Sequence, residues 1–114
     1  MTVQLFGTKK SNATKKVERF LKERSIDFQF VDVNGKAPAP KELDALADAA
    51  GGHDALIDAG SKSYRGRGME YMEFDAREEL LEDASLMRVP AIRCDGGAAV
   101  QPDEATLKRL LGLG

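Results

Sequence analysis

A strand, a helix and a second strand within the first 33 residues constrain the fold more than any other feature of this chain. Val3 and Leu5 alternate with polar neighbours and run into Phe6-Gly7, the pattern of a short strand that ends in a turn. Ser11 is a preferred N-cap for the helix that follows, and Phe28–Val33 is rich in the aromatic and β-branched residues of strands. Two strands joined by a helix in so few residues are expected to be parallel, with a right-handed crossover.

The segment between the second strand and residue 88 is predicted to be mostly helical. An alanine-proline linker at residues 37–40 precedes an amphipathic helix that ends at Gly51-Gly52. We expect one helical turn at His53–Ile57, a loop at Ser61–Gly68, and an acidic helix whose apolar stripe runs from Ala76 to Met87.

A hairpin and a last helix complete the pattern. Residues 89–100 predict two strands around an Asp95-Gly96 turn, and Pro102-Asp103 is typical of a helix start. The order is then β-α-β, a helical insertion at about residues 40–87, and β-β-α. This order predicts a single α/β domain over residues 1–114 with a thioredoxin-like fold, a four-stranded mixed sheet covered by helices on both faces.

Composition argues against several classes of function. A net charge of -2 offers no electrostatic basis for direct nucleic-acid or membrane binding. No apolar run reaches the length of a membrane span, and Met1 is not followed by a signal peptide, so we expect a cytoplasmic protein. Cys94 is the only cysteine, which excludes an intrachain disulfide and a multi-cysteine metal site. His53 has no clustered ligands, so we expect no metal site.

Charge is unevenly distributed along the chain. Residues 1–26 carry seven basic and two acidic side chains, a net charge of +5. Residues 70–86 carry one basic and seven acidic side chains, a net charge of -6. These regions either offer opposite faces to partners or to each other, or are simply two solvated helix surfaces.

Three segments carry the pattern of a known family. They are the opening Leu5–Lys16 (LFGTKKSNATKK), Leu56–Arg65 (LIDAGSKSYR) and Ser85–Ile92 (SLMRVPAI). Together they resemble the arsenate-reductase family, the ArsC and Spx group of the thioredoxin superfamily, and the resemblance covers almost the whole chain. It implies that Pro90 is cis and lies beside the start of the first helix.

The chain departs from this family where the family does its chemistry. The family's helix begins with a nucleophilic cysteine, often in a CxxC pair, and Ser11 and Thr14 occupy those two positions here. A serine hydroxyl keeps its proton at neutral pH and no base is evident beside it, which argues against thiol-arsenate or disulfide chemistry at this site. Val89, preceded by Arg88, stands where the reductases have an arginine before the proline, and Asp58 stands where another arginine is expected. Arsenate reduction is therefore not expected.

The start of the first helix is the candidate binding surface. Its free N–H groups carry partial positive charge, so Ser11 either only caps the helix or also binds an anion or a thiol. Lysines here oppose the helix dipole, a cost that a bound anion or an acidic partner would offset. The basic loop Tyr64–Arg67 is a weak signal for phosphate or carboxylate binding. The resemblance adds the surface beside the proline, where the Val89 N–H and C=O are expected to point outward. The candidate binding residues are Lys9, Lys10, Ser11, Asn12, Arg65, Val89 and Pro90.

Three functional classes remain open. The leading one is a non-catalytic binding or regulatory module that takes a protein partner on the former active-site surface, as Spx-like members do. The second is a thiol-binding enzyme in which Ser11 or Thr14 orients glutathione or a similar thiol. The third is a redox protein acting through Cys94. We expect no resident cofactor, with glutathione as a possible ligand, and a protein, small anion or thiol as the partner at the helix N-terminus.

Overall fold

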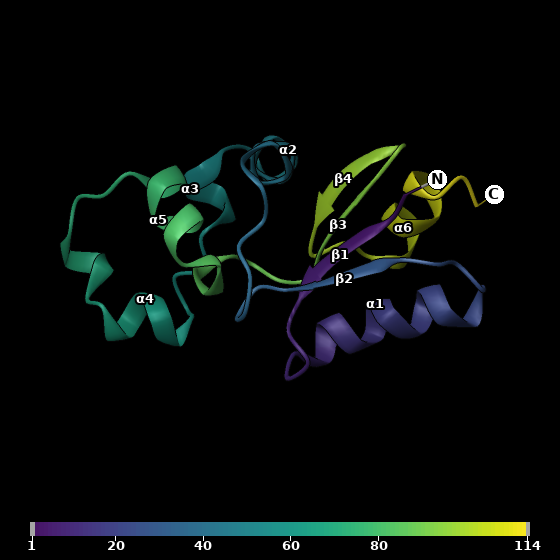
Figure 1. Cartoon of the computed structure of the whole chain (residues 1–114), viewed down its shortest axis with the longest axis horizontal. Helices are drawn as coiled ribbons and strands as arrows, with labels where there is room; N and C mark the ends of the chain where they lie inside the picture. Colours follow the sequence, from purple (N-terminus) through teal and green to yellow (C-terminus); the bar gives the residue numbers. More distant parts are fainter. Residues whose placement is uncertain (1, 114) are drawn as a thin grey trace.

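The computed structural model describes residues 2–113 and has a four-stranded sheet with helices on both faces, the fold class predicted from the sequence (Figure 1). The strand order is β2-β1-β3-β4; β1 pairs with β2 in parallel, and the other neighbours are antiparallel. No helix within residues 2–113 is both long enough and apolar enough to cross a membrane. The strands are β1 (Gln4–Gly7), β2 (Gln29–Asp32), β3 (Ala91–Cys94) and β4 (Gly97–Val100).

Alternate residues of the strands supply two separate cores. Leu5, opposite Ile92, packs toward α1 (Asn12–Glu23) and α6 (Glu104–Leu110). Phe6, opposite Ala91, packs on the other side toward α2 (Pro40–Ala50) and the inserted helices. This alternation follows from the two-residue period of a strand and explains why both faces of so small a sheet are apolar.

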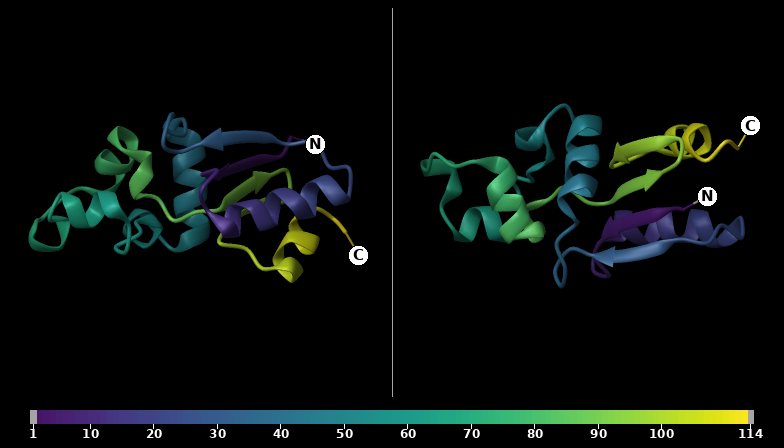
Figure 2. Two further views of the ribbon diagram at one scale, coloured as in Figure 1. Left: turned by 90° about the horizontal axis from the view of Figure 1, so that it is seen from below. Right: turned by 45° about the horizontal axis from the view of Figure 1, so that its top comes forward.

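The insertion between β2 and β3 forms a helical lobe, defined as residues 53–86, beyond one end of the sheet (Figures 1 and 2). It makes the molecule elongated, with extents of 44 × 25 × 22 Å. An isolated bridge between Ile57 and Met87 joins the two ends of the lobe where it meets the sheet. Its elements are α3 (His53–Leu56), α4 (Lys62–Gly66), η1 (Met69–Tyr71), α5 (Ala76–Glu82) and η2 (Ala84–Leu86).

Two predictions for the lobe were wrong because short polar caps divide it more finely than its apolar pattern indicates. The predicted loop at Ser61–Gly68 contains α4, which begins where the Ser61 Oγ accepts a hydrogen bond from the Tyr64 N–H at 3.2 Å. The predicted acidic helix does not reach Met87 but ends at Glu82. Asp83 follows it and accepts a hydrogen bond from the Ser85 N–H at 3.1 Å, which starts η2.

The second strand is shorter than predicted, four residues instead of six. The chain turns directly after it, where an Asp32 carboxylate oxygen accepts a hydrogen bond from the Asn34 N–H at 2.9 Å. The hairpin around Asp95-Gly96 and the last helix with Asp103 as its N-cap are as predicted.

Candidate functional site

Ser11 is the N-cap of α1, as its residue type predicts. Its Oγ accepts a hydrogen bond from the Thr14 N–H at 3.1 Å, and its own N–H donates to the Thr8 carbonyl at 3.2 Å. Ser11 is half-buried, and its neighbour Asn12 is exposed. One helix N–H is therefore satisfied by the cap, while the dipole of a twelve-residue helix still points at this surface.

Thr14 does not share this surface, which corrects the expectation that it could orient a thiol. Its side chain is fully buried, and Oγ1 has no hydrogen-bond partner among residues 2–113. It packs against Gly7 so closely that a Cβ at Gly7 would lie 2.5 Å from the Thr14 Cγ2. The third residue of α1 faces β1, so this hydroxyl lies inside the protein and away from any ligand at the helix start.

The two lysines before Ser11 differ in whether their side chains form an ion pair. The Lys9 ammonium lies 3.3 Å from a carboxylate oxygen of Glu18 and 4.1 Å from the ring centre of Phe30. Glu18 is buried, so this contact fastens Lys9 to the fold and lowers the cost of placing a cation near the helix start. Lys10 is exposed and forms no ion pair within residues 2–113. Lys10 is therefore the cation that is free to meet a partner.

The Val89-Pro90 peptide bond is cis, as the resemblance implies. Pro90 is buried and Val89 half-buried. The backbone beside them is less open than expected: the Pro90 carbonyl accepts a hydrogen bond from the Gln101 N–H at 2.7 Å, and the Gln101 side-chain amide lies 3.5 Å from the Val89 carbonyl oxygen. Only the Val89 N–H is without a partner among residues 2–113.

Gln101 has a place in the site that the sequence did not suggest. It follows β4 with a positive φ of 50° and is exposed. Its contacts with residues 89 and 90 depend on how β4 returns beside β3, which a single sequence does not display. No signal in the chain could have indicated this residue before the fold was known.

A groove of about 600 Å³ begins at Val89 and Pro90 and runs between α1 and the start of α6. Ala13 and Val17 line it from α1, and Leu107 lines it from α6. The predicted residues 9–12 lie outside its lining. Residues 9–12 and residues 89–90, the two parts of the predicted site, thus lie at the start of α1. The groove beside them was missed by the sequence analysis.

Asp58, which stands where the resemblance expects an arginine, and Arg88, which precedes the other such position at Val89, have structural contacts here. The Asp58 carboxylate accepts a hydrogen bond from the Gly60 N–H at 2.9 Å and shapes the turn before α4. The Arg88 N–H donates to the Leu56 carbonyl at 2.8 Å, while its side chain is exposed. Val89 itself is apolar, so the position immediately before Pro90 carries no cation.

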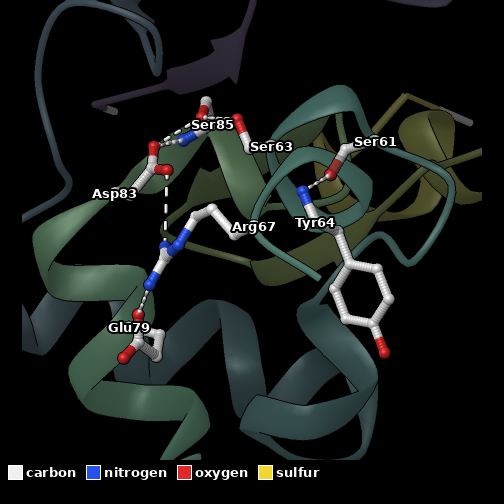
Figure 3. Close-up of polar contacts among 7 residues, drawn as sticks. All are labelled: Ser61, Ser63, Tyr64, Arg67, Glu79, Asp83 and Ser85. Carbon is white, nitrogen blue, oxygen red and sulfur yellow. Dashed lines mark hydrogen bonds and ion pairs between the residues drawn. The ribbon is translucent and has the colours of Figure 1, made fainter. Parts of the chain in front are cut away.

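Arg65 and Arg67, the cations of the basic loop, differ in whether their side chains form ion pairs within the lobe. Arg67 contacts Glu79 and lies 3.6 Å from Asp83, so its guanidinium is held by the lobe's own carboxylates (Figure 3). Hydrogen bonding to Glu79 raises the pKa of Arg67 above its ordinary value. Arg65 is exposed on α4, and no side-chain contact joins it to residues 9–12 in the described part of the chain. Its membership of the site stays a prediction.

A chain of hydroxyl groups in the lobe has a structural explanation. The Ser63 and Ser85 hydroxyl oxygens lie 2.6 Å apart, and the Ser85 hydroxyl also contacts the Asp83 carboxylate (Figure 3). A nucleophilic serine needs a base that can take its proton, and Asp83 is instead neutralised by Arg67. These hydrogen bonds between side chains hold α4 against η2.

Cys94 lies at the far end of β3 from Pro90. It is half-buried, and its sulfur is 3.5 Å from the Leu110 carbonyl oxygen. Cys94 is four positions after Pro90 along extended chain, a distance of about 13 Å. Residues 2–113 contain no group of three or more metal-binding side chains. The start of α1 is thus a surface without a thiol.

Comparisons with known proteins locate this architecture among solved structures. No family model and no curated protein matches the sequence. The structure is similar to an arsenate reductase from Vibrio cholerae, with a TM-score of 0.75, 17% identity and coverage of 100% of this chain and 98% of the other. It is also similar to a protein described as ArsC family related from Bacteroides fragilis, with a TM-score of 0.80, 15% identity and coverage of 96% and 98%.

A third structure has the highest identity of the three. It is an arsenate reductase (ArsC) related protein from Brucella melitensis, with a TM-score of 0.63, 22% identity and coverage of 95% of this chain and 92% of the other. All three matches include the inserted lobe as well as the sheet, because each spans at least nine-tenths of both chains. The chain therefore has, over essentially its whole length, the thioredoxin-like fold of the ArsC-type structures.

Proposed function

We propose that this protein is a non-catalytic binding module that takes a protein partner at the start of α1, beside Pro90. The observation that carries the proposal is the lack of a thiol there: Ser11 occupies the cap position, and Cys94, the only cysteine of the chain, lies at the other end of β3. In the ArsC family, as the resemblance implies, a cysteine at the helix start is the nucleophile. Within residues 2–113 the Ser11 Oγ forms a side-chain hydrogen bond with the Thr14 N–H and with no basic group that would activate its oxygen.

The features that remain suit recognition. Lys10 is exposed and unpaired in the described chain, the helix dipole adds partial positive charge, and the Val89 N–H is free to donate. A partner segment that carries a carboxylate would offset the cost of Lys10 beside the positive end of the dipole. An extended segment could also accept a hydrogen bond from Val89. Acidic protein segments are therefore the chemistry that this surface fits.

Glutathione is the second candidate ligand, favoured by the same free Val89 N–H next to a groove. It carries two carboxylates and an extended tripeptide backbone, which suit a lysine and an unpaired donor. Ser11 is the hydroxyl that could approach its sulfur, because Thr14 is buried. This candidate predicts binding, and it supplies no group for catalysis.

A charge-reversal comparison tests the partner proposal. Wild-type protein and Lys10→Glu are used to capture partners from the native cell extract, with Lys41→Glu, an exposed lysine on α2, as the matched control. A partner that is lost with Lys10→Glu, kept with Lys41→Glu, and weakened by salt supports the proposal. Partners bound equally by all three proteins would contradict it.

Amide resonances separate the ligand classes. Sulfate, phosphate and glutathione are titrated into labelled protein, and shifts are expected at Ser11–Thr14 and at Val89, smaller at high salt. Shifts with glutathione alone would favour the thiol candidate. Flat titrations with all three ligands would leave Ser11 as a cap and nothing more.

Arsenate-reductase and disulfide-reductase assays test the absence of catalysis. We expect no turnover with either a glutathione-type or a thioredoxin-type electron supply. Turnover that survives Cys94→Ala would show that a group other than the thiol performs the reaction, and the proposal would fall.

A further inference from the structure

The side chain of Gln101 lies at the proposed site, and neither the fold nor the proposed function accounts for it. Gln101 is exposed, and it lines the same end of the groove between α1 and α6 as Val89 and Pro90. It directly follows β4, whose last residue is Val100. An exposed glutamine at the end of a strand is ordinary by itself, so its backbone and its contacts decide whether it has a role.

The backbone of Gln101 has a conformation that favours glycine. Its φ of 50° lies in the left-handed region, which side chains with a Cβ rarely adopt. Gln101 also precedes Pro102, and a residue before proline is normally extended. Conformations of this kind persist where the surrounding structure imposes them, and they are concentrated at sites that bind ligands.

Two contacts place Gln101 over the residues before β3. Its N–H donates to the Pro90 carbonyl at 2.7 Å, which fixes its backbone. Its side-chain Nε2 lies 3.5 Å from the Val89 carbonyl oxygen, at the long end of the range for a hydrogen bond. Because a carbonyl only accepts, this contact also orients the amide, with Nε2 toward Val89 and Oε1 away from it.

Val89 offers an extended partner segment only half of what regular strand pairing needs. In an antiparallel pair, one residue donates its N–H to the residue opposite and accepts through its C=O. The Val89 N–H is free among residues 2–113, but its C=O is covered by the Gln101 amide. The carbonyl of a partner segment therefore finds a donor, while the segment's N–H needs an acceptor other than the Val89 carbonyl.

The Gln101 Oε1 is placed to be that acceptor. It belongs to the same amide group that covers the Val89 carbonyl, and it accepts no hydrogen bond within residues 2–113. An N–H covered on binding without an acceptor costs affinity, so an acceptor at this point favours a peptide that has one.

We propose that Gln101 recognises the main chain of the bound segment. Its Oε1 accepts a hydrogen bond from a backbone N–H of the segment, and the Val89 N–H donates to a backbone carbonyl of the same segment. The inference rests on the proposed function, because it requires an extended segment at this surface. Lys10 then recognises the charge of the segment, whereas Gln101 and Val89 recognise its peptide groups. The segment residue opposite Gln101 must have an N–H, which excludes proline there.

Isothermal titration calorimetry with two acidic peptides tests this recognition at low salt. One probe is a short polyglutamate with blocked ends. The other has the same charge, but esters replace its backbone amides, so it keeps carbonyls and lacks N–H donors. Wild-type protein is compared with Gln101→Met, which preserves the length of the side chain and removes its amide. The ratio of amide-peptide affinity to ester-peptide affinity should be about fivefold larger for wild-type protein, the effect of one hydrogen bond.

Two further variants serve as controls. Gln101→Gly suits a φ of 50°, so it should unfold at the same or a higher urea concentration than wild-type protein. It should nevertheless lose the preference for the amide peptide, as Gln101→Met does. Lys10→Glu should weaken the binding of both peptides alike and leave their affinity ratio unchanged.

The outcomes separate this inference from the proposed function. An affinity ratio that is the same in wild-type protein, Gln101→Met and Gln101→Gly would overturn the inference. If Lys10→Glu still weakens binding in that case, the proposed function stands. Tighter binding of the amide peptide by Gln101→Met would also overturn the inference, because Gln101 would then only block the Val89 carbonyl. Wild-type protein that binds neither peptide would contradict the proposed function and this inference together.

Discussion

The sheet with α1 and α6 and the helical lobe are stabilised in different ways. Around the sheet, side chains such as Leu5 and Leu21 are fully buried, and the helix that covers them runs for twelve residues. The helices α3, α4 and α5 have four, five and seven residues, too short to be stable by themselves. They pack in an apolar core that includes the fully buried Leu56, Leu80 and Leu86, and they are also joined by contacts between polar side chains (Figure 3). One chain thus combines a part determined by apolar periodicity with a part in which individual polar pairs act beside the apolar core.

Asp44 shows how the lobe is tied to α2. One of its carboxylate oxygens lies 2.8 Å from the His53 Nε2 and 3.0 Å from the Arg77 Nε, so a single side chain joins α2, α3 and α5. Hydrogen bonds from Arg77, and then from His53, hold the pKa of Asp44 below its usual value. Because this carboxylate is near solvent, the contribution is modest and sensitive to salt.

The largest expected effect on stability comes from the apolar core between α1 and the sheet, and it can be compared with the same kind of change in the lobe. Leu21→Ala removes a fully buried side chain between α1 and the sheet, and should lower the free energy of unfolding by about 2–5 kcal/mol in urea titrations. Leu80→Ala removes an equally buried side chain from α5, so it is the matched change in the lobe, and it should cost less because the lobe is also held by polar contacts. Equal losses would mean that the two regions do not differ in the way described.

Gly7→Ala tests the close contact beneath the start of α1. The new Cβ would lie 2.5 Å from the Thr14 Cγ2, and we expect a loss of about 1–3 kcal/mol of stability. Adding Thr14→Ala should restore part of that loss, measured as the interaction energy of a double-mutant cycle. Strictly additive losses would contradict the packing.

Arg67→Gln tests the polar side of the comparison. It removes the ion pairs with Glu79 and Asp83, and amide hydrogen exchange in α4 and η2 should become faster while exchange in α1 is unchanged. The same acceleration should appear in wild-type protein at high salt. Uniform acceleration across α1 and the lobe would show that the lobe does not open as a unit of its own.

The smallest effect is a dependence of stability on pH. Since the folded protein holds the pKa of Asp44 below its usual 3.8, its contribution is present above that value and disappears as the pH falls through the folded pKa. The difference in unfolding free energy between wild-type protein and Asp44→Asn should therefore be largest at neutral pH and shrink in acid. A difference that is constant from neutral pH into acid would rule out the ionised pair as its source.

The sheet half was predictable because its determinants are local. The alternation of Val3 and Leu5, the cap at Ser11 and the Asp95-Gly96 turn each act over a few residues. The lobe was predicted less well for the opposite reason. Its helix boundaries depend on caps such as Ser61 and Asp83, which compete with the apolar periodicity and prevail.

The candidate site was predictable only in part. The cap at Ser11 and the exposure of Lys10 agree with the sequence analysis. The buried position of Thr14 and the pairing of Lys9 with Glu18 depend on how α1 rotates against the sheet. Residue type alone does not carry that information.

The strand order has a consequence for how the protein folds during synthesis. β1 lies between β2 and β3, and it pairs with β3 across 87 residues of sequence, as in the pair Leu5 and Ile92. On the ribosome, β1 and β2 are available early, while one edge of β1 must wait until the whole lobe has been synthesised. Contacts between such distant residues slow folding far more than they reduce stability, because the cost of closing a loop grows only slowly with its length. We therefore expect the last quarter of the chain to decide when this protein folds.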